Sequence, residues 1–350
     1  MRLVVDPDRL EAPDSRRALR EAAMILRRGG LVALPTETVY GLGANALDPA
    51  AVARIFAAKE RPAWDPVIVH LAGPVSGNSL LDSLVTEIPP SGRALISAFW
   101  PGPLTLLLPR SPRVPDIVTA GRPLVGVRMP THPVAAHLIA EAGVPLAAPS
   151  ANLFGHISPT RAEHVLADLE GRIDAVLDAG PAEHGVESTV LDPNQSPIMI
   201  YRPGAITAEQ IESVAGPVRY YVPQVAPDTQ SLPAPGVGIR HYAPRARMVL
   251  IDAPLEELES LLGAAIARQG GAAPIGLLLP AELQGSALVE RPDVIASPWG
   301  SWSAPAELAR RLYTTLRELE QRGCSVIICP LPPEEGIGLA IRDRLAKAAG

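Results

Sequence analysis

Short apolar runs alternate with amphipathic helical patterns along the first two thirds of the chain. Residues 31–35, LVALP, have the length of a buried strand and lie between glycines and a polar stretch. Before them, apolar residues at helical spacing predict a helix that Asp14 or Ser15 caps and that Gly29 and Gly30 end. The remaining predicted strands or strand exits are 66–73, 104–109, 124–130, 144–152, 175–180, 188–192 and 198–204. The remaining predicted helices begin at Asp48-Pro49 or lie near 91–99, 132–142 and 160–169.

Several of these strands lie too close together in the sequence for a crossover helix to connect them. Such a chain is expected to form an α/β fold with a mixed, twisted sheet flanked by helices. Residues 36–43, TETVYGLG, are predicted to be a glycine-containing loop after the first strand. We therefore expect residues 1–214 to form one α/β domain.

The pattern changes after this domain. Residues 215–245 are rich in proline and have no steady hydrophobic period, which is typical of a linker or a functional loop. From Met248 onward the alternation resumes, with helices predicted over 254–269, 304–321 and 336–349. Residues 246–350 are therefore predicted to form a second, small α/β domain.

Composition narrows the classes of function. Hydrophobic residues make up 47% of the 350 residues, enough for a large core, but no apolar run reaches the roughly 18 residues needed to cross a bilayer. The N-terminus has no basic segment followed by an apolar one, so we expect a soluble, cytoplasmic protein. The net charge of -6 argues against a broad electrostatic surface for nucleic acid, although a cleft can still focus the field of a few cations.

Polar side chains cluster where predicted strands end, and the common nucleotide, zinc-protease and serine-hydrolase motifs are absent. Thr36, Glu37 and Thr38 follow one strand, and Ser150 and Asn152 leave another at alternating positions. Taken singly, each group is equally well a turn or a helix cap.

Cations accompany these groups. Lys59 and Arg61 leave the end of a predicted helix together, and His70 lies inside an apolar strand. Arg128 and Arg202 stand in apolar strands, where burial is costly without an anion. Exposure on an edge strand is the alternative for the arginines, and a satisfied core position is the alternative for His70. Together the groups describe strand ends that converge on a pocket suited to a polyphosphate and a carboxylate.

Seven segments resemble, in order and spacing, the YrdC-like domain, which is the catalytic domain of L-threonylcarbamoyladenylate synthases. They are PTETVYGLGANALD, the Lys59-Glu60-Arg61 triplet with DPVIVH, FWPGPLTLLLP, VGVRMP, the Ser150-Ala151-Asn152 triplet, GVESTVLD and YRPGAI. The match covers about residues 12–214. PGVGIRHYAPRA and EEGIGLAIRDRLAKAA resemble the linker motif and the terminal helix of the long, two-domain form of the family. The resemblance implies a YrdC-like twisted mixed sheet followed by a small Rossmann-like C-terminal domain.

The resemblance also implies a nucleotidyltransferase reaction. L-threonine, bicarbonate or CO2 and ATP give threonylcarbamoyl-AMP and pyrophosphate, and Mg2+ is expected to arrive with ATP. Other machinery then transfers the threonylcarbamoyl group to tRNA; direct contact of this chain with tRNA is left open. Because such a transfer depends on positioning and charge stabilisation, it needs no nucleophilic side chain.

Residue roles follow from the same resemblance. The expected catalytic residues are Lys59, Arg61, Ser150 and Asn152. The expected ATP-binding residues are Lys59, Arg61, Asp65, Ser150, Asn152, Ser158, Arg202 and His241. The expected threonine-binding residues are Thr38, His70, Arg128, Ala148 and Ser188. Asp65 stands where the family commonly has asparagine, and His241, in the linker, is expected to close over ATP as part of a lid.

Two other functions are weighed. An RNA-binding protein could use the basic groove of a YrdC-like domain, but the acidic net charge and the lack of interleaved arginines and aromatics count against it here. A carbamoyl transferase with a YrdC-like domain would need further domains for which this chain has no room.

Overall fold

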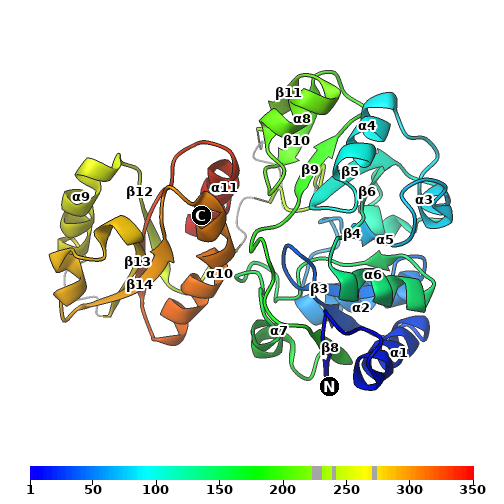
Figure 1. Ribbon diagram of the computed structural model, residues 1–350, viewed down its shortest axis with the longest axis horizontal. Coiled ribbons are helices and arrows are strands. Elements are labelled where there is room, and N and C mark those ends of the chain that lie inside the picture. The colour runs from blue at the N-terminus through cyan, green and yellow to red at the C-terminus, as the bar shows by residue number, and fades with distance from the viewer. Residues whose placement is uncertain (223–230, 239–241, 270–273) are drawn as a thin grey trace. The chain divides into compact units, whose positions relative to one another are not determined.

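The computed structural model describes residues 1–222, 231–238, 242–269 and 274–350. The chain divides into two compact units (Figure 1). The first unit comprises Met1–Phe154, Ser158–Glu183 and Glu187–Gly238, and the second comprises Gly155–Ile157, His184–Val186 and Ile239–Gly350. Each unit has its own sheet, so each is described by itself.

Among the described residues, the first unit contains an 11-stranded sheet in the order β1-β8-β2-β3-β7-β4-β6-β5-β9-β10-β11. The strands are β1 (Arg2–Val4), β2 (Val32–Leu34), β3 (Gly41–Asn45), β4 (Ile68–His70), β5 (Leu104–Pro109), β6 (Leu124–Arg128), β7 (Leu146–Ala147), β8 (Ala175–Asp178), β9 (Thr189–Asp192), β10 (Ile198–Arg202) and β11 (Val218–Tyr220). Parallel pairs such as β4 with β6 adjoin antiparallel pairs such as β5 with β6. The mixed α/β sheet predicted from the sequence is therefore confirmed.

Helices cover both faces of this sheet. They are α1 (Pro13–Arg27), α2 (Pro49–Lys59), α3 (Ser79–Leu84), α4 (Pro90–Phe99), α5 (Asp116–Thr119), α6 (Pro133–Ala142), α7 (Ala162–Leu169) and α8 (Ala208–Ala215). Apolar positions of α1 and α6 share one core with β2 and β8, whereas α2, α4 and α7 pack into the other large core. These two cores hold the strand ends that carry the predicted site.

The N-cap predicted for α1 is wrong. Neither Asp14 nor Ser15 caps the helix; it begins at Pro13, whose fixed φ suits the first helical turn. Ser15 instead accepts a hydrogen bond from the backbone N–H of Asp6 at 3.2 Å. At α2 the prediction is confirmed, because Asp48 accepts from Ala50 N and Ala51 N.

Part of the predicted loop 36–43 is also a strand. Gly41 and Gly43 belong to β3, which pairs with β2 in antiparallel register. A Cβ at Gly43 would lie 2.8 Å from Leu34 Cδ2, so glycine permits this close approach. Conversely, the predicted strand 144–152 is short: β7 ends at Ala147, and Ser150 makes only an isolated bridge to Gly41.

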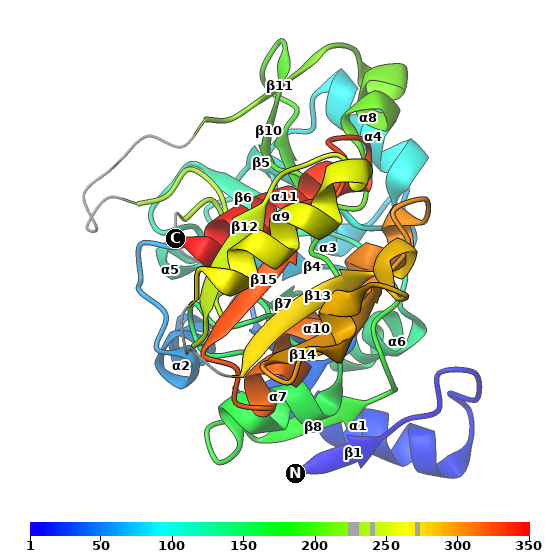
Figure 2. The ribbon, with the colours of Figure 1, turned by 90° about the vertical axis from the view of Figure 1, so that its left-hand side faces the viewer.

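The second unit is a parallel α/β domain. Its sheet has the order β12-β15-β13-β14 among the described residues. The strands are β12 (Arg247–Ile251), β13 (Ile275–Pro280), β14 (Val294–Gly300) and β15 (Val326–Pro330). The helices are α9 (Leu255–Ala267), α10 (Pro305–Gln321) and α11 (Ile337–Ala349), with short 3-10 turns at Ala281–Leu283 and Ala287–Glu290. Figure 2 shows α9 in front of this sheet and α10 and α11 behind it.

The range 215–245, expected to be linker and lid, contains ordered structure where it is described. β11 lies in this range and pairs in parallel with β10. Residues 231–238 pack onto the first unit, where Ala234 and Val237 are buried against Ile68, Leu107 and Val190. Leu232 N donates to Trp64 O at 3.0 Å. This segment therefore forms part of the first unit's surface beside Asp65.

Across the described part of the chain, we find no helix that combines the length and apolarity needed to traverse a membrane.

Candidate functional site

Arg128 and His70 lie side by side at the ends of two neighbouring strands. They are register partners in the parallel pair of β6 with β4, and both are buried. Arg128 Nη1 donates to Thr38 Oγ1 at 3.0 Å, and its Nε donates to Gly102 O at 3.3 Å. The structure thus brings together three of the predicted threonine-binding residues. Ala148, a fourth, joins the same sheet region by donating its N–H to Ile68 O at 2.9 Å.

Glu37 belongs to this group, although it was not among the predicted site residues. Its Oε1 lies 2.6 Å from Arg128 Nη2, and both side chains are almost fully buried. Burial raises the pKa of the Glu37 carboxyl, but the charge and hydrogen bond of Arg128, together with the backbone N–H groups of Glu37 and Thr131, outweigh it, so the pKa lies below its usual range. The only sequence signal was its place between Thr36 and Thr38 at a strand end, which is equally typical of a turn.

Ser188 and Arg202 form a second group. Arg202 Nε and Nη2 donate to Ser188 O at 3.1 and 3.0 Å, and Nη2 also donates to Ser188 Oγ at 3.1 Å. Ser188 Oγ is in addition 2.8 Å from Thr105 Oγ1 on β5. Thr105 was missed because it stands inside the apolar run LTLLLP, where a hydroxyl gives no periodic signal.

Lys59, the last residue of α2, is buried and contacts backbone oxygen. Its Nζ donates to Ser150 O at 2.5 Å and also donates to Asn152 O. Burial, and next the charge of Arg61, lower the pKa of Lys59 well below its usual range. In this structure the lysine holds the Ser150–Asn152 turn, so the predicted catalytic residues of both motifs adjoin one another.

Arg61 and Asp65 form a buried ion pair next to that turn. Arg61 Nη2 lies 2.9 Å from Asp65 Oδ1, and its guanidinium stacks 5.9 Å from the ring centroid of Phe154. Burial raises the pKa of Asp65, and the charges of Arg61, Lys59 and Arg202 oppose that rise. A cluster of three cations around one carboxylate is suited to an anionic ligand.

Ser158, another predicted ATP-binding residue, is fully buried. Its Oγ donates to Glu187 Oε1 at 2.6 Å. Glu187, next to Ser188 in the chain, was not predicted, and its pairing with Ser158 connects two segments of the site. His241 lies outside the described residues, so its expected role stays a prediction.

The burial of His70 fixes its protonation state. Burial first, and the Arg128 charge second, lower the pKa of His70 to about 3, so the ring is neutral near pH 7. In the described part of the chain, the Nδ1 atom of this ring and both carboxylate oxygens of Glu37 are buried and meet full hydrogen-bond geometry with no partner, although the backbone of Ile68 lies close enough to shift the pKa of His70 and the backbone N–H groups of Glu37 and Thr131 close enough to shift that of Glu37. Buried polar atoms in this condition are uncommon and mark places where a ligand would complete the bonding.

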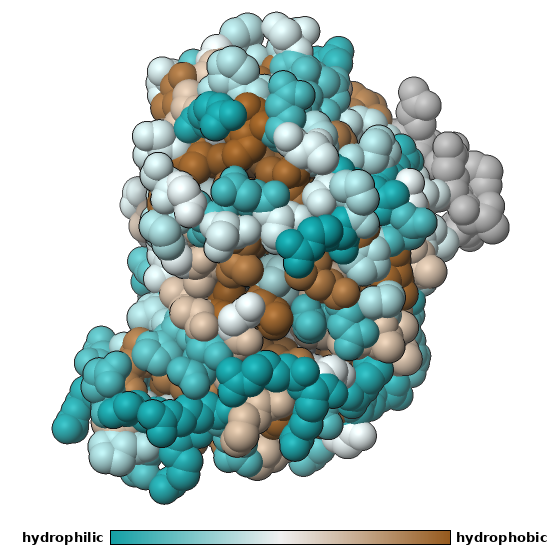
Figure 3. Space-filling model, turned by 90° about the vertical axis from the view of Figure 1, so that its right-hand side faces the viewer, coloured by the Kyte–Doolittle hydropathy of each residue, from teal (hydrophilic) through white to brown (hydrophobic). Residues whose placement is uncertain are grey.

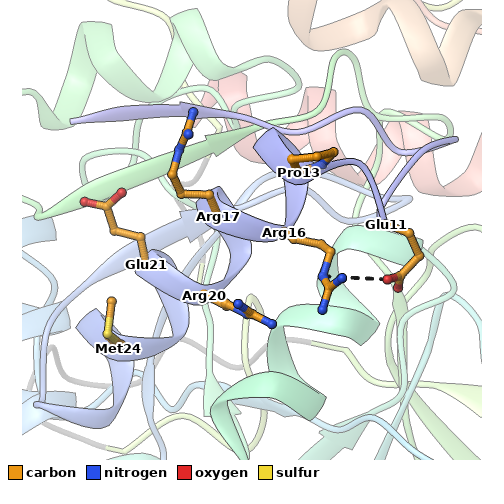
Figure 4. A pocket seen from close by; sticks show the side chains of 7 residues that line it. All are labelled: Glu11, Pro13, Arg16, Arg17, Arg20, Glu21 and Met24. Carbon is orange, nitrogen blue, oxygen red and sulfur yellow. Dashed lines mark ion pairs between the residues drawn. The ribbon is translucent and has the colours of Figure 1, made fainter.

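A separate surface cavity of about 570 Å³ lies along α1 (Figure 4). Its lining includes Arg16, Arg17 and Arg20, together with Glu11 and Glu21. It contains none of the predicted site residues, and its arginines are matched by nearby carboxylates such as Glu11, 3.8 Å from Arg16. Hydrophilic side chains also dominate this lower part of the face in Figure 3. The cavity is therefore an ordinary charged surface.

Two family models match the chain. The first, described as telomere recombination, matches residues 24–204, and the second, described as threonylcarbamoyl-AMP synthase, C-terminal domain, matches residues 206–350. The threonylcarbamoyl-AMP synthase of Pyrococcus abyssi is 40% identical over 333 residues, covering 95% of this chain and 94% of the relative. That of Bacillus subtilis is 43% identical over 334 residues, covering 95% and 93%.

Solved structures show the same two-part architecture. A crystal structure of Pyrococcus abyssi Sua5 complexed with L-threonine aligns with a TM-score of 0.86 at 39% identity, covering 100% of this chain and 98% of that one. A double variant of the same protein aligns with a TM-score of 0.88 at 38% identity, covering 100% and 97%. The likeness thus extends over both units of the chain.

Proposed function

The chain belongs to the threonylcarbamoyl-AMP synthase family, and from this premise we propose that its first unit joins L-threonine, bicarbonate or CO2 and ATP. The products are threonylcarbamoyl-AMP and pyrophosphate, so the chain is a nucleotidyltransferase that supplies threonylcarbamoyladenosine modification of tRNA. The alternative of a purely RNA-binding protein is not favoured, since the relatives that match about the whole chain are synthases.

One observation supports this proposal most strongly: the predicted site residues form two groups of buried side chains, one with paired charges and one with several cations, at strand ends and at the end of α2. Arg128 with Glu37, Thr38 and His70 offers a charged anchor of amino-acid size. Arg61 pairs with Asp65, and the charges of Lys59 and Arg202 also oppose the rise in the pKa of that carboxyl, so we propose these three cations as the group that binds phosphates.

The proposed chemistry requires position more than a reactive side chain. The threonine ammonium loses a proton to water, and the neutral nitrogen then adds to the carbon of CO2 and releases a second proton to give a carbamate. A carbamate oxygen attacks the α-phosphate of ATP while pyrophosphate leaves. In this proposal Arg61 and Arg202 stabilise charge on the phosphates and on the leaving group. Lys59 contributes by fixing the backbone of the Ser150–Asn152 turn, and we propose that the side chains of this turn contact the nucleotide.

We propose that Mg2+ enters as part of the ATP complex. Among the described residues no three His, Cys, Asp or Glu side chains form a group fit to hold a metal ion, so no protein-held metal is part of the proposal. The tRNA-modifying machinery is a proposed partner downstream, and a cytoplasmic location is likewise proposed.

The test is an omission assay. Pyrophosphate release from ATP should require both L-threonine and bicarbonate, because the nucleophile forms only from the two together. Release that continues unchanged without threonine would refute the proposal.

A further inference from the structure

Glu37 is a buried charge whose bonding is incomplete. The side chain is 1% exposed and its Oε1 lies 2.6 Å from Arg128 Nη2. The backbone N–H groups of Glu37 and Thr131 approach the carboxylate and help to lower its pKa, but neither carboxylate oxygen, nor Arg128 Nη2, meets full hydrogen-bond geometry with any partner in the described part of the chain. A buried ion pair without its full set of hydrogen bonds is costly, because both ions have lost their water. The buried pair therefore either lowers the stability of the fold or is completed by a further polar group from a ligand.

The partner of Glu37 is held firmly in place. Arg128 is fixed by Thr38 Oγ1 through Nη1 and by Gly102 O through Nε. Thr38 Oγ1 is in turn 2.9 Å from Thr36 Oγ1, and Thr36 Oγ1 donates to Val39 O at 2.6 Å. The backbone on both sides of Glu37 is therefore tied down. Neither charge of the pair is free to move toward water.

The net charge of the buried groups determines which kind of ligand the site accepts. Glu37 and Arg128 together are neutral, and His70 beside them carries no charge near pH 7. A zwitterion adds no net charge and can place its carboxylate beside Arg128 and its ammonium beside Glu37. A hydroxy acid of the same shape would bring one uncompensated negative charge into a buried site, which is strongly unfavourable.

On these grounds, and resting on the proposed function, we propose that the Glu37 carboxylate binds the α-ammonium group of L-threonine and restricts the site to zwitterionic amino acids. Nδ1 of His70, which meets full hydrogen-bond geometry with no partner among the described residues, is then placed for the substrate's remaining polar group, its hydroxyl. Glu37 thereby joins the threonine-binding set that Arg128, Thr38 and His70 form.

The test compares two ligands on one variant. Calorimetry measures binding of L-threonine and of its hydroxy-acid counterpart, 2,3-dihydroxybutanoate, to the full chain and to Glu37→Gln. The substitution should weaken threonine binding by at least about 10-fold, because a charge-assisted contact is lost. Binding of the hydroxy acid should stay the same or tighten. Glu163→Gln, an exposed glutamate paired with Arg2, is the matched control and should leave both affinities unchanged.

Equal weakening of both ligands would show that Glu37 only supports the fold, and an unchanged threonine affinity would also overturn the proposal. If Glu37→Gln does not fold, the native chain still decides. Threonine binding at pH 7, measured in two buffers of different ionisation enthalpy, should release no net proton because the ammonium stays charged. Release of about one proton per threonine would overturn the inference. A folded chain that binds no threonine at all would instead refute the proposed function.

Discussion

At the scale of single residues, the proposed threonine side of the site depends on Arg128. Two segments of the first unit, residues 37–38 and Gly102, hold its guanidinium. Glu37, Thr38 and Gly102 each contact a different nitrogen of this side chain. A planar guanidinium fixed in this way offers two N–H donors side by side to a carboxylate. The flexible ammonium group of a lysine does not reproduce this arrangement. The position of charge, and the shape of the donor group, both matter here.

Arg128→Lys is therefore expected to raise the KM for threonine by roughly 10- to 100-fold, because it keeps the charge beside Glu37 but removes the fork. The KM for ATP should change little, since the cations proposed to bind the phosphates, Lys59, Arg61 and Arg202, lie in the other group. Steady-state kinetics of pyrophosphate release measure both constants. Arg110→Lys, at an arginine paired with Asp116, is the matched control. An equal rise in the KM for ATP would contradict the assigned role.

His70 gives a prediction in pH. Its folded pKa of about 3 is far below the ordinary 6.5, since burial disfavours the charged ring. The unfolded chain therefore binds a proton that the folded chain does not, and stability is lost as pH falls from about 6.5 toward 3. Compared with His70→Gln, the native chain should lose about 2 kcal/mol more of its free energy of unfolding between pH 7 and pH 5.

Urea denaturation at the two pH values measures this difference. The matched control is His137→Gln, at a half-buried histidine of α6. Parallel losses in the native chain and in His70→Gln would show that the ring is not buried in its neutral form.

At the scale of elements, the site depends on close backbone approach as much as on side chains. Gly204, directly after β10, shows this. A Cβ at this position would lie 2.3 Å from Thr189 N and 2.5 Å from the carbonyl carbon of Ser188. Because these are backbone atoms, they cannot rotate away. The glycine therefore allows the end of β10 to lie against the segment that carries Ser188.

Gly204→Ala should lower the free energy of unfolding by about 1–3 kcal/mol through this overpacking, and it should weaken threonine binding by displacing Ser188. Gly285→Ala is the matched control, since a Cβ there meets no atom within 4 Å. Urea denaturation and calorimetry measure the two effects. A Gly204→Ala chain as stable as the control would contradict the packing shown here.

Most elements of the sheet could be predicted from the sequence because buried strands read as short apolar runs. β3 could not, since the Gly41-Leu42-Gly43 segment has low strand propensity and its pairing with β2 decides its conformation. Thr105 was missed for a related reason, and Glu37, noted in the polar cluster at a strand end, was assigned no ligand. Their roles come from partners far along the chain, Arg128 and Ser188, which no local pattern records.

At the scale of the whole molecule, the chain combines one unit that holds the predicted site with a second, parallel α/β unit. The order of seven motifs predicted the family from sequence, and relatives that match 95% of the chain confirm it. The contacts of Lys59 with backbone oxygens, by contrast, needed the folded chain, since a cation at a helix end has many uses.

The central claim is that one site joins three substrates, and the product of the omission assay tests it most directly. With 13C-labelled bicarbonate, ATP and L-threonine, mass spectrometry should find one threonylcarbamoyl-AMP species that carries a single heavy carbon. The species should disappear when any one of the three substrates is left out. Two results would contradict the account. One is release of pyrophosphate with AMP, free of the heavy carbon, as the sole nucleotide product. The other is formation of pyrophosphate and a labelled nucleotide product when threonine is left out.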